Sequence, residues 1–239
     1  MLDRRRPNTC VPDSFLSERC LLCCGEDYLE LISALSSLGI SAEGLPEHIY
    51  RCYRIILFDE FTLVWTGIGT GCLEPLLHEV LTSGLIMSIT LIGTAGALNE
   101  KTPKGKAAFI ESAINGVTPF ATDNAPLEYP SSKAPDGALK VLSSDLYYGF
   151  SAIDSPFVTR LQQSVPGMRA RFEALKVKAD LIDMETAQFY RLCKVYGQDR
   201  LAFVAIKGAA NNAADPHQQT FHSAAVLRSA VELGLGWLS

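Results

Sequence analysis

Thr66-Gly67-Ile68-Gly69-Thr70-Gly71 follows an apolar run and precedes a helical pattern, so it is predicted to join a strand to a helix. Two further stretches, Ile92-Gly93-Thr94-Ala95-Gly96-Ala97-Leu98 and Asp180-Leu181-Ile182-Asp183-Met184-Glu185-Thr186-Ala187, also stand where a predicted strand ends. In open α/β sheets, ligands bind beyond the carboxyl ends of the strands. The three stretches together therefore predict a glycine-lined pocket with one carboxylate that can hold hydroxyl groups.

Outward from these stretches, apolar runs alternate with helical patterns along the chain. Strands are expected at residues 20–24, 50–58, 61–66, 86–92, 107–110, 138–143 and 202–206, and helices at 28–38, 73–83, 183–196 and 221–233. This alternation predicts an α/β sandwich around a mixed, largely parallel sheet. We expect residues 1–18 to form a flexible N-terminal arm and residues 19–239 to form a single domain.

The composition excludes several classes of function. Hydrophobic residues make up 48% and charged residues 20% of the 239-residue chain, as is ordinary for a soluble enzyme. A net charge of −5 argues against nucleic-acid binding. No apolar run reaches the roughly 18 residues that span a bilayer, and the basic N-terminus continues into polar residues, so neither a membrane partner nor a secretory signal is expected.

The seven cysteines have no regular spacing, which suits a reducing cytoplasm. A zinc site built on Cys20 and Cys23 would need a second pair of ligands, and none follows at a suitable spacing. We therefore expect a cytoplasmic protein without a metal or cofactor.

Glycines at the first two stretches would let backbone N–H groups approach a ligand, and a helix N-terminus favours negative charge. The first stretch lacks the Gly-Lys-Ser/Thr end of a P-loop, and Cys72 replaces the third glycine of a dinucleotide fingerprint. In the second stretch Thr94 offers a hydroxyl, while Ala95 and Gly96 leave room for a flat ring. The alternative for each stretch is a tight structural turn.

In the third stretch, Glu185 can accept hydrogen bonds from the vicinal hydroxyls of a ribose, and Met184 can pack under the sugar. The alternative is that Asp183 or Glu185 merely caps the following helix. His78-Glu79 lacks the second histidine of a metalloprotease helix, and we interpret it as a solvated pair on a helix.

With these residues the chain resembles, over about residues 20–233, the family of purine nucleoside phosphorylase, uridine phosphorylase and methylthioadenosine/S-adenosylhomocysteine nucleosidase. The resemblance implies a three-layer α/β/α sandwich, a homodimer or hexamer, and cleavage of the N-glycosidic bond of a nucleoside. It also implies that the ribose, the phosphate or water, and the base are bound by Met184 and Glu185, by Gly69 and Thr94, and by Ala95, Gly96 and Tyr147, respectively.

Two positions depart from the family pattern in ways that bear on the reaction. Leu91 stands where the phosphorylases have a phosphate-binding arginine, and this loss favours water as the nucleophile. Asn211 stands where purine-cleaving members have an aspartate that protonates the leaving base. An amide can hydrogen-bond the base but cannot act as a general acid, and Asp215 is an alternative acid if the loop is shifted.

At the end of the first strand, Cys24-Gly25-Glu26-Asp27-Tyr28 is acidic and lacks the proline of the phosphorylases. This is closer to the nucleosidases, whose glutamate at this place activates water. Glu26 is the candidate for that role and Asp27 the second choice. The alternative is a turn of solvated acids at a helix N-terminus.

The sequence thus predicts hydrolysis of a nucleoside, with Glu26, Asn211 and Glu185 in the catalytic roles. One alternative is a phosphorylase whose phosphate-binding cation is Arg51 or Arg54 of a neighbouring subunit. A second is a nucleoside-binding homologue without activity, which Leu91 and Asn211 would both suit. A third, a nucleotide-sugar or dinucleotide enzyme built on the first glycine stretch, would leave the other two stretches unexplained.

Overall fold

The computed structural model describes residues 6–99, 102, 104–117, 128–146, 155–212 and 222–239. The strands are β1 (Arg19–Cys24), β2 (Glu47–Tyr50), β3 (Tyr53–Leu57), β4 (Thr62–Thr66), β5 (Ser88–Ala97), β6 (Ala107–Val117), β7 (Glu128–Pro130), β8 (Leu139–Ser144), β9 (Leu181–Asp183) and β10 (Ala202–Asn212). The helices are α1 (Tyr28–Ser37), α2 (Thr70–Leu81), α3 (Pro156–Ser164), α4 (Met168–Lys176), α5 (Thr186–Gly197) and α6 (Ser223–Leu238), with short 3₁₀ turns at Asp13–Phe15 and Gln198–Arg200.

All ten strands form one mixed sheet, in the order β10-β6-β8-β9-β5-β1-β4-β3-β2, with β7 beside β6. Because β10 also pairs with β5, the strands β5, β10, β6, β8 and β9 close on themselves. Parallel and antiparallel pairings are equally common, so the sheet is less parallel than expected. The antiparallel share comes from the β2–β3–β4 meander and from the pairing of β9 with β5, β10 with β6, and β7 with β6.

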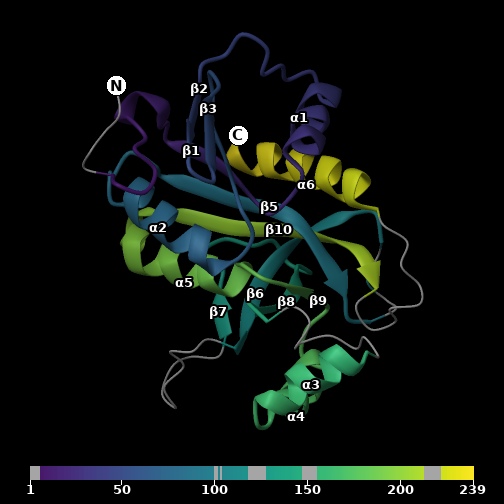
Figure 1. Ribbon diagram of the computed structural model, residues 1–239. Coiled ribbons are helices and arrows are strands. Elements are labelled where there is room, and N and C mark those ends of the chain that lie inside the picture. The colour runs from purple at the N-terminus through teal and green to yellow at the C-terminus, as the bar shows by residue number, and fades with distance from the viewer. Residues whose placement is uncertain (1–5, 100–101, 103, 118–127, 147–154, 213–221) are drawn as a thin grey trace.

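Helices cover both faces of the sheet, which confirms the predicted three-layer arrangement. In Figure 1, α1 and α6 lie on one face, and α2 and α5 lie on the other. Leu31 and Leu35 of α1 pack with Leu227 of α6 in one core cluster. Leu73 of α2 packs with Phe189 of α5 in the second. The apolar stripe of each helix is what buries it against the sheet.

The carboxyl ends of three strands create an opening beside β5. β1 pairs with β5 only as far as Cys23 opposite Ile92, and β9 takes the same side of β5 from Gly96 onward. Residues 93–95 of β5 therefore have none of the described strands on that side, because β1 and the antiparallel β9 both end at this gap. The gap is the structural basis of the cavity described below.

The second glycine stretch differs from its expected form. β5 runs to Ala97, so residues 93–97 continue the strand and pair with β10 rather than forming a loop. β10 likewise runs beyond its expected end at residue 206, to Asn212. The short strands β2 and β7 were not expected at all. Long apolar runs extend through small residues here because neighbouring strands supply the hydrogen bonds, an influence that local patterns do not record.

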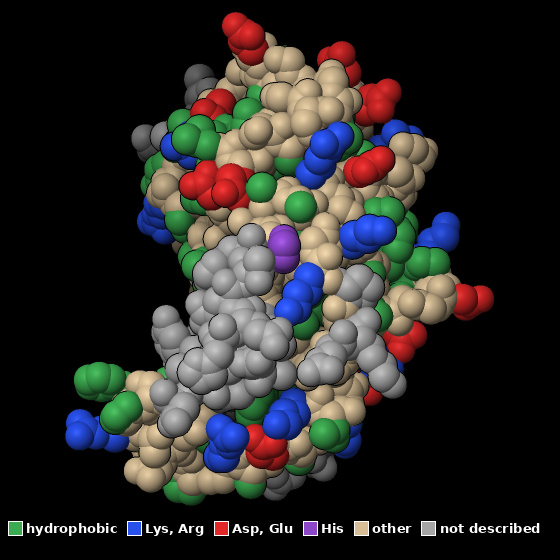
Figure 2. Space-filling model, turned by 90° about the vertical axis from the view of Figure 1, so that its right-hand side faces the viewer, with side chains coloured by type: hydrophobic (Ala, Val, Ile, Leu, Met, Phe, Trp, Pro, Cys, Tyr) green, Lys and Arg blue, Asp and Glu red, His purple; other side chains and the backbone are tan. Residues whose placement is uncertain are grey.

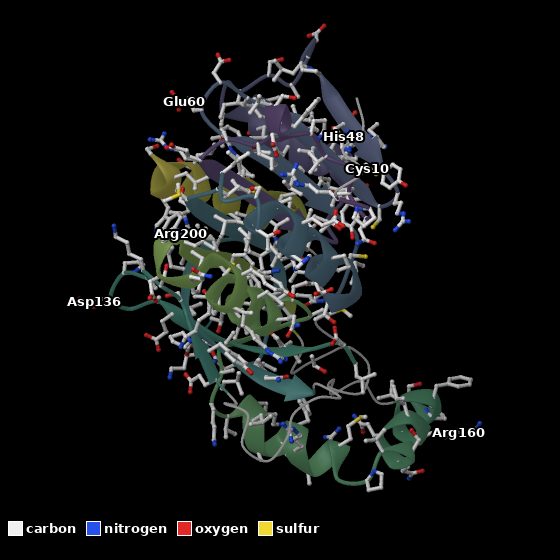
Figure 3. All side chains as sticks on the ribbon, turned by 90° about the vertical axis from the view of Figure 1, so that its left-hand side faces the viewer. Cys10, His48, Glu60, Asp136, Arg160 and Arg200 are labelled. Atoms are coloured by element: carbon white, nitrogen blue, oxygen red, sulfur yellow. The ribbon has the colours of Figure 1, made fainter. Side chains whose placement is uncertain are left out.

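The N-terminal segment, which the sequence suggested as a flexible arm, packs against the domain over its described residues from Arg6 onward. Thr9 and Val11 are fully buried, and the carbonyl oxygen of Thr9 lies 2.8 Å from Nε2 of His48 on β2. Figure 3 shows Cys10 and His48 next to one another at this edge of the molecule.

This packing corrects the interpretation of His78-Glu79 as a solvated pair. His78 is exposed, but Glu79 is buried and accepts hydrogen bonds from Asn8 and Thr9. The partners lie far away in the sequence, so the helical pattern around Glu79 could not reveal them.

The surface carries charges of both signs. Figure 2 shows acidic and basic side chains intermixed on one face of the molecule, without a continuous basic surface among the coloured residues. Within the described ranges, none of the helices combines the length and the apolar character that crossing a membrane would need.

Candidate active site

A cavity of about 200 Å³ lies at the gap beside β5. Its lining comes from the ends of β1, β5, β9 and β10 and from the loop before α2. The lining residues are Cys24, Gly25, Glu26, Ile68, Thr94, Ala95, Gly96, Ile182, Asp183, Met184, Glu185, Ala210, Asn211 and Ser223. The structure thus brings together residues from all three stretches that the sequence singled out, together with Glu26 and Asn211.

Glu26 enters the cavity because the chain turns sharply after β1. Gly25 has φ +74°, and a Cβ there would lie 2.6 Å from Cγ1 of Ile68, so only glycine fits this turn. The carbonyl oxygen of Glu26 accepts a hydrogen bond from Nε1 of Trp65, and its carboxylate accepts one from the backbone N–H of Thr94. The first bond fixes the backbone at Glu26, and the second holds its carboxylate at the side of β5 that lacks a strand. Asp27, the second choice for this role, instead caps α1 by accepting from the N–H of Glu30.

The first glycine stretch binds carboxylates of the protein itself. The N–H of Gly69 donates to Oε1 of Glu185 at 3.0 Å. Thr70 donates from its N–H and its hydroxyl to the carboxylate of Asp145, at 3.3 and 3.0 Å. Gly69 itself does not line the cavity. The N-terminus of α2 therefore has the anion-binding character that the sequence predicted, and two internal carboxylates satisfy it.

Lys207 of β10 lies beneath the cavity and is only 1% exposed. Its ammonium is 3.3 Å from Oδ2 of Asp183 and 3.5 Å from Oε2 of Glu185. It also approaches Glu26: a Cβ on Gly93 would meet Oε1 of Glu26 at 2.9 Å and Nζ of Lys207 at 3.1 Å. The absence of a side chain at Gly93 is what leaves space for the two charged groups.

The electrostatics of this group follow from burial and pairing. Burial by itself would lower the pKa of Lys207, but Asp183, Glu185 and Glu26 outweigh it and raise the pKa well above its usual value. Burial raises the pKa of Glu185, and the nearby ammonium of Lys207 only partly offsets this. Lys207 is therefore always protonated. Burial disfavours the ionised form of Glu185, and its contacts with Lys207 and Gly69 partly compensate for this.

Asp183 and Glu185 divide the two roles that the sequence left open for them. Glu185 occupies the N-cap position of α5 but makes no capping hydrogen bond. Asp183 accepts hydrogen bonds from the N–H and the hydroxyl of Thr186 and from the hydroxyl of Ser143. The cap is thus supplied by Asp183, and Glu185 is left to face the cavity beside Met184.

Asn211 reaches the cavity through a bulge in β10. Ala209 pairs with Ala95 and Asn211 pairs with Gly96, so Ala210 is an extra residue in the strand. A bulge re-aims the side chains that follow it, and bulges are common beside active sites. Oδ1 of Asn211 is buried, and no group among the described residues donates a hydrogen bond to it. An acceptor in this state needs a donor that the described residues do not supply.

Thr94, Ala95, Gly96 and Met184 all line the cavity. Leu91 is fully buried in the hydrophobic core and does not line it. Tyr147, proposed under the base, and Asp215, the alternative acid, lie outside the described residues.

Sequence reasoning missed Lys207. Its strand was expected to end at residue 206, so the lysine was assigned to a loop. A signal was present, because Lys207 stands between the apolar runs 201–206 and 208–210. Lysine is almost never fully buried without a partner, so a lysine in such a run predicts a buried carboxylate nearby. Among the described residues, no group of three or more His, Cys, Asp and Glu side chains is arranged to hold a metal ion.

The arrangement matches known proteins in fold. The chain aligns with futalosine hydrolase of Helicobacter pylori at a TM-score of 0.65 and 12% identity, covering 92% of this chain and 98% of that one. A methylthioadenosine/S-adenosylhomocysteine nucleosidase from Colwellia psychrerythraea, in complex with adenine, gives a TM-score of 0.65 and 13% identity over 93% and 96% of the two chains. Purine nucleoside phosphorylase from Toxoplasma gondii, in complex with immucillin-H, gives a TM-score of 0.65 and 15% identity over 97% of each chain.

These likenesses include both hydrolases and a phosphorylase, so they show the fold and not the reaction. No curated protein matches the chain. A family model described as the phosphorylase superfamily matches residues 19–233, which confirms the resemblance carried by the three stretches. The chain therefore belongs to the phosphorylase superfamily, whose members cleave nucleoside glycosidic bonds.

Proposed function

We propose that this protein hydrolyses the N-glycosidic bond of a nucleoside. One observation carries the proposal: Glu26, Met184, Glu185 and Asn211 line a single cavity at the strand ends, with Lys207 beneath them. Each group suits a part of this reaction, and no other cavity lined by described residues combines them.

Glu185 and Met184 would hold the ribose. Each carboxylate oxygen has two lone pairs. Oε1 of Glu185 uses one for Gly69 and Oε2 uses one for Lys207, so each oxygen keeps capacity for a sugar hydroxyl. The thioether of Met184 would pack against the apolar face of the sugar. The ammonium of Lys207 favours the ionised form of Glu185, which is the form that accepts both hydroxyl protons.

Glu26 would activate the water. Its carboxylate is half-buried and fixed by Thr94, and it faces the same cavity. In the proposed step, the water oxygen bonds to C1′ and its proton passes to Glu26. The C1′–N bond breaks, and its electron pair goes to the base. A positioned general base contributes about 10²–10⁴ in rate, so Glu26→Gln should lower kcat by about that factor.

Three features favour water over phosphate. The amides before and at the start of α2 are already bonded to Glu185 and Asp145. Leu91 puts an apolar core residue at the position of the family's arginine. Among the described residues, the charged groups at the cavity are three carboxylates and one ammonium, an environment that repels a phosphate dianion.

Two alternatives to a hydrolase are a phosphorylase and a nucleoside-binding protein without activity. Arg51 and Arg54, the cations named for a phosphorylase, are bonded to Asn8 and Glu47 within this chain. A binding protein without activity is favoured by Asn211, since that position offers no general acid.

The test is an incubation of the purified protein with purine and pyrimidine nucleosides, with and without phosphate, followed by chromatography of the products. Free base and free ribose without phosphate support hydrolysis. Ribose 1-phosphate that forms only with phosphate would show a phosphorylase. A nucleoside that binds but stays intact through long incubation would show a binding protein. The Glu26→Gln variant is the matched control, because it keeps the size of the side chain and removes the base.

A further inference from the structure

The cavity offers no proton for a leaving base from its described lining. Asn211 cannot act as an acid, and the carboxyl groups in the lining are Glu26, Asp183 and Glu185. Asp183 is taken up by the cap of α5 and by Lys207. Glu26 and Glu185 have the water and ribose roles in the proposed reaction. The side chain of His222 lies beside Gly105 and does not line the cavity.

Without a proton donor, a neutral base must leave as an anion, which is a poor leaving group. A base that is already a cation leaves as a neutral molecule, because the electron pair of the C1′–N bond cancels its charge. Protonation by a general acid is worth about 10²–10⁴ in rate. A site whose described lining holds no such acid therefore discriminates by this factor in favour of nucleosides whose base carries a positive charge.

The charge of the cavity favours the same ligands. Glu26, Asp183 and Glu185 surround the single ammonium of Lys207, and all four groups are buried or half-buried. Charges in such surroundings interact more strongly than in water. The excess of carboxylate attracts a cationic ring and stabilises the oxocarbenium-like positive charge that develops on the sugar.

Asn211 adds a requirement for a hydrogen-bond donor on the base. Its Oδ1 is buried without a donor among the described residues, and it lies in the lining of the cavity. Leaving such an acceptor unpaired in a complex weakens binding. An amide or amino N–H on the ring of the ligand would remove this cost.

Building on the proposed hydrolase activity, we propose that the substrate is a ribonucleoside whose base is a cation while the glycosidic bond is intact, of the class of N-ribosylated pyridinium rings that bear a carboxamide. Water adds its oxygen to C1′ and gives one proton to Glu26. The C1′–N bond breaks, and the pyridinium departs as a neutral pyridine. Ribose and one proton are the other products, so atoms and charge balance without a general acid.

The test measures kcat/KM of the wild-type protein for nicotinamide riboside, as the cationic probe, and for adenosine, inosine, methylthioadenosine and uridine, as neutral ones. We expect nicotinamide riboside to exceed every neutral nucleoside by at least about 100-fold, the low end of the contribution of a general acid. Comparable values for any neutral nucleoside would overturn this proposal and leave the proposed hydrolase activity standing. If that neutral activity then disappears in Asp215→Asn, the missing acid is Asp215.

The Asn211→Asp variant separates enzyme discrimination from the intrinsic reactivity of a pyridinium nucleoside. The new carboxyl would lie among carboxylates that raise its pKa, so it would keep a proton to give to a neutral base. We expect the ratio of kcat/KM for nicotinamide riboside to that for adenosine or inosine to fall at least about tenfold. An unchanged ratio would overturn the proposal. Absence of cleavage of every nucleoside, with a folded protein by circular dichroism, would instead overturn the proposed function itself.

Discussion

Glu79 and Glu185 are two buried carboxylates with similar exposure, 4% and 5%, but with different surroundings. Glu79 accepts four hydrogen bonds, from the backbone and side chains of Asn8 and Thr9, at 2.7–2.8 Å. Glu185 has the N–H of Gly69 at 3.0 Å and the ammonium of Lys207 at 3.5 Å. Glu79 is saturated by neutral donors, whereas Glu185 depends on one cation and keeps free lone pairs.

The pKa values of the two groups move in opposite directions for this reason. Burial by itself would raise the pKa of Glu79, but the hydrogen bonds from Thr9 and Asn8 outweigh it, and the pKa lies below its usual value. Burial raises the pKa of Glu185, and its contacts only partly offset this. A buried carboxylate with all its lone pairs in use thus fastens the N-terminal segment to α2, and one with lone pairs left over faces a cavity. Burial alone does not distinguish a structural acid from a functional one.

The largest expected effect comes from removing the cation on which Glu185 depends. Lys207→Met leaves Asp183, Glu185 and Glu26 without a buried positive charge. Breaking a buried ion pair from one side costs about 3–5 kcal/mol, so we expect a loss of this size in the free energy of unfolding. Urea unfolding followed by circular dichroism measures it. The matched control is Lys140→Met, because Lys140 is an exposed lysine paired with Glu111 and Glu128.

For the exposed pair we expect at most about 1 kcal/mol. Equal losses in the two variants would show that the carboxylates around Lys207 are not buried in solution, and the contrast with Glu79 would then fail.

The cavity that Glu185 faces could be predicted from the sequence, whereas the partners of Glu79 could not. Met184-Glu185 and Glu26 follow strands, and strand ends meet at one edge, so their common cavity was predictable from local patterns. Glu79 accepts hydrogen bonds from Asn8 and Thr9, which are 71 and 70 residues away in the sequence, and the residues around Glu79 show only a helix. The bulge at Ala210 that aims Asn211 depends on two facing strands, so it could not be predicted from one of them. Lys207 was missed because the length of β10 depends on its neighbours β5 and β6.

The second prediction concerns the activity that Glu185 supports. Glu185→Gln keeps the size of the side chain, but it removes the negative charge and replaces one acceptor oxygen with a donor. Hydrogen bonds to charged groups are worth about 1.5–3 kcal/mol, so the loss of those to ribose hydroxyls should lower kcat/KM at least about 100-fold. Stopped or continuous assays with the best nucleoside of the panel measure this loss. The control is Glu74→Gln, an exposed residue of α2 that bonds Tyr196.

Glu74→Gln should keep wild-type kcat/KM. Retention of activity in Glu185→Gln would remove the ribose-binding role and leave Glu185 as a second structural acid like Glu79.

The third prediction is a loss of stability without a loss of activity. Glu79→Gln places an NH₂ group against N–H and O–H donors of Asn8 or Thr9, so buried donors lose their acceptor. We expect the free energy of unfolding to fall by about 1–3 kcal/mol, with kcat/KM per folded molecule unchanged. The same urea experiment and assay measure both quantities. A loss of kcat/KM without a loss of stability would contradict the structural assignment of Glu79.

The two residues should contribute slopes of opposite sign to the pH dependence of the free energy of unfolding. Because the pKa of Glu79 is lowered on folding, its contribution is present above its unfolded pKa, near 4.5, and is lost as the pH falls through the lower folded value. Because the pKa of Glu185 is raised, the folded state holds the proton longer, and stability falls as the pH rises from about 4.5 toward the higher folded value. In Glu79→Gln, the loss of stability as the pH falls below about 4.5 should become smaller. In Glu185→Gln, the loss of stability as the pH rises above about 4.5 should disappear. The reverse assignment of slopes would contradict both interpretations.

The smallest expected loss of activity tests the space that the functional acid cluster needs. Gly93→Ala would place a Cβ 2.9 Å from Oε1 of Glu26 and 3.1 Å from Nζ of Lys207, whereas Glu79 lies in a different part of the molecule. The end of the Glu26 side chain can move by a few tenths of an ångström, but alanine rarely adopts the φ of +159° that Gly93 has, so we expect a stability loss of about 1–3 kcal/mol. The hydrogen bond from Thr94 would weaken and the carboxylate would leave its position for the water, which should lower kcat/KM about tenfold. Gly236→Ala in α6, where a Cβ meets nothing within 4 Å, is the control and should be neutral or slightly stabilising. Wild-type activity in Gly93→Ala would show that the close approach of Glu26 and Lys207 is a packing feature, and Glu26 would then belong with Glu79 rather than with Glu185.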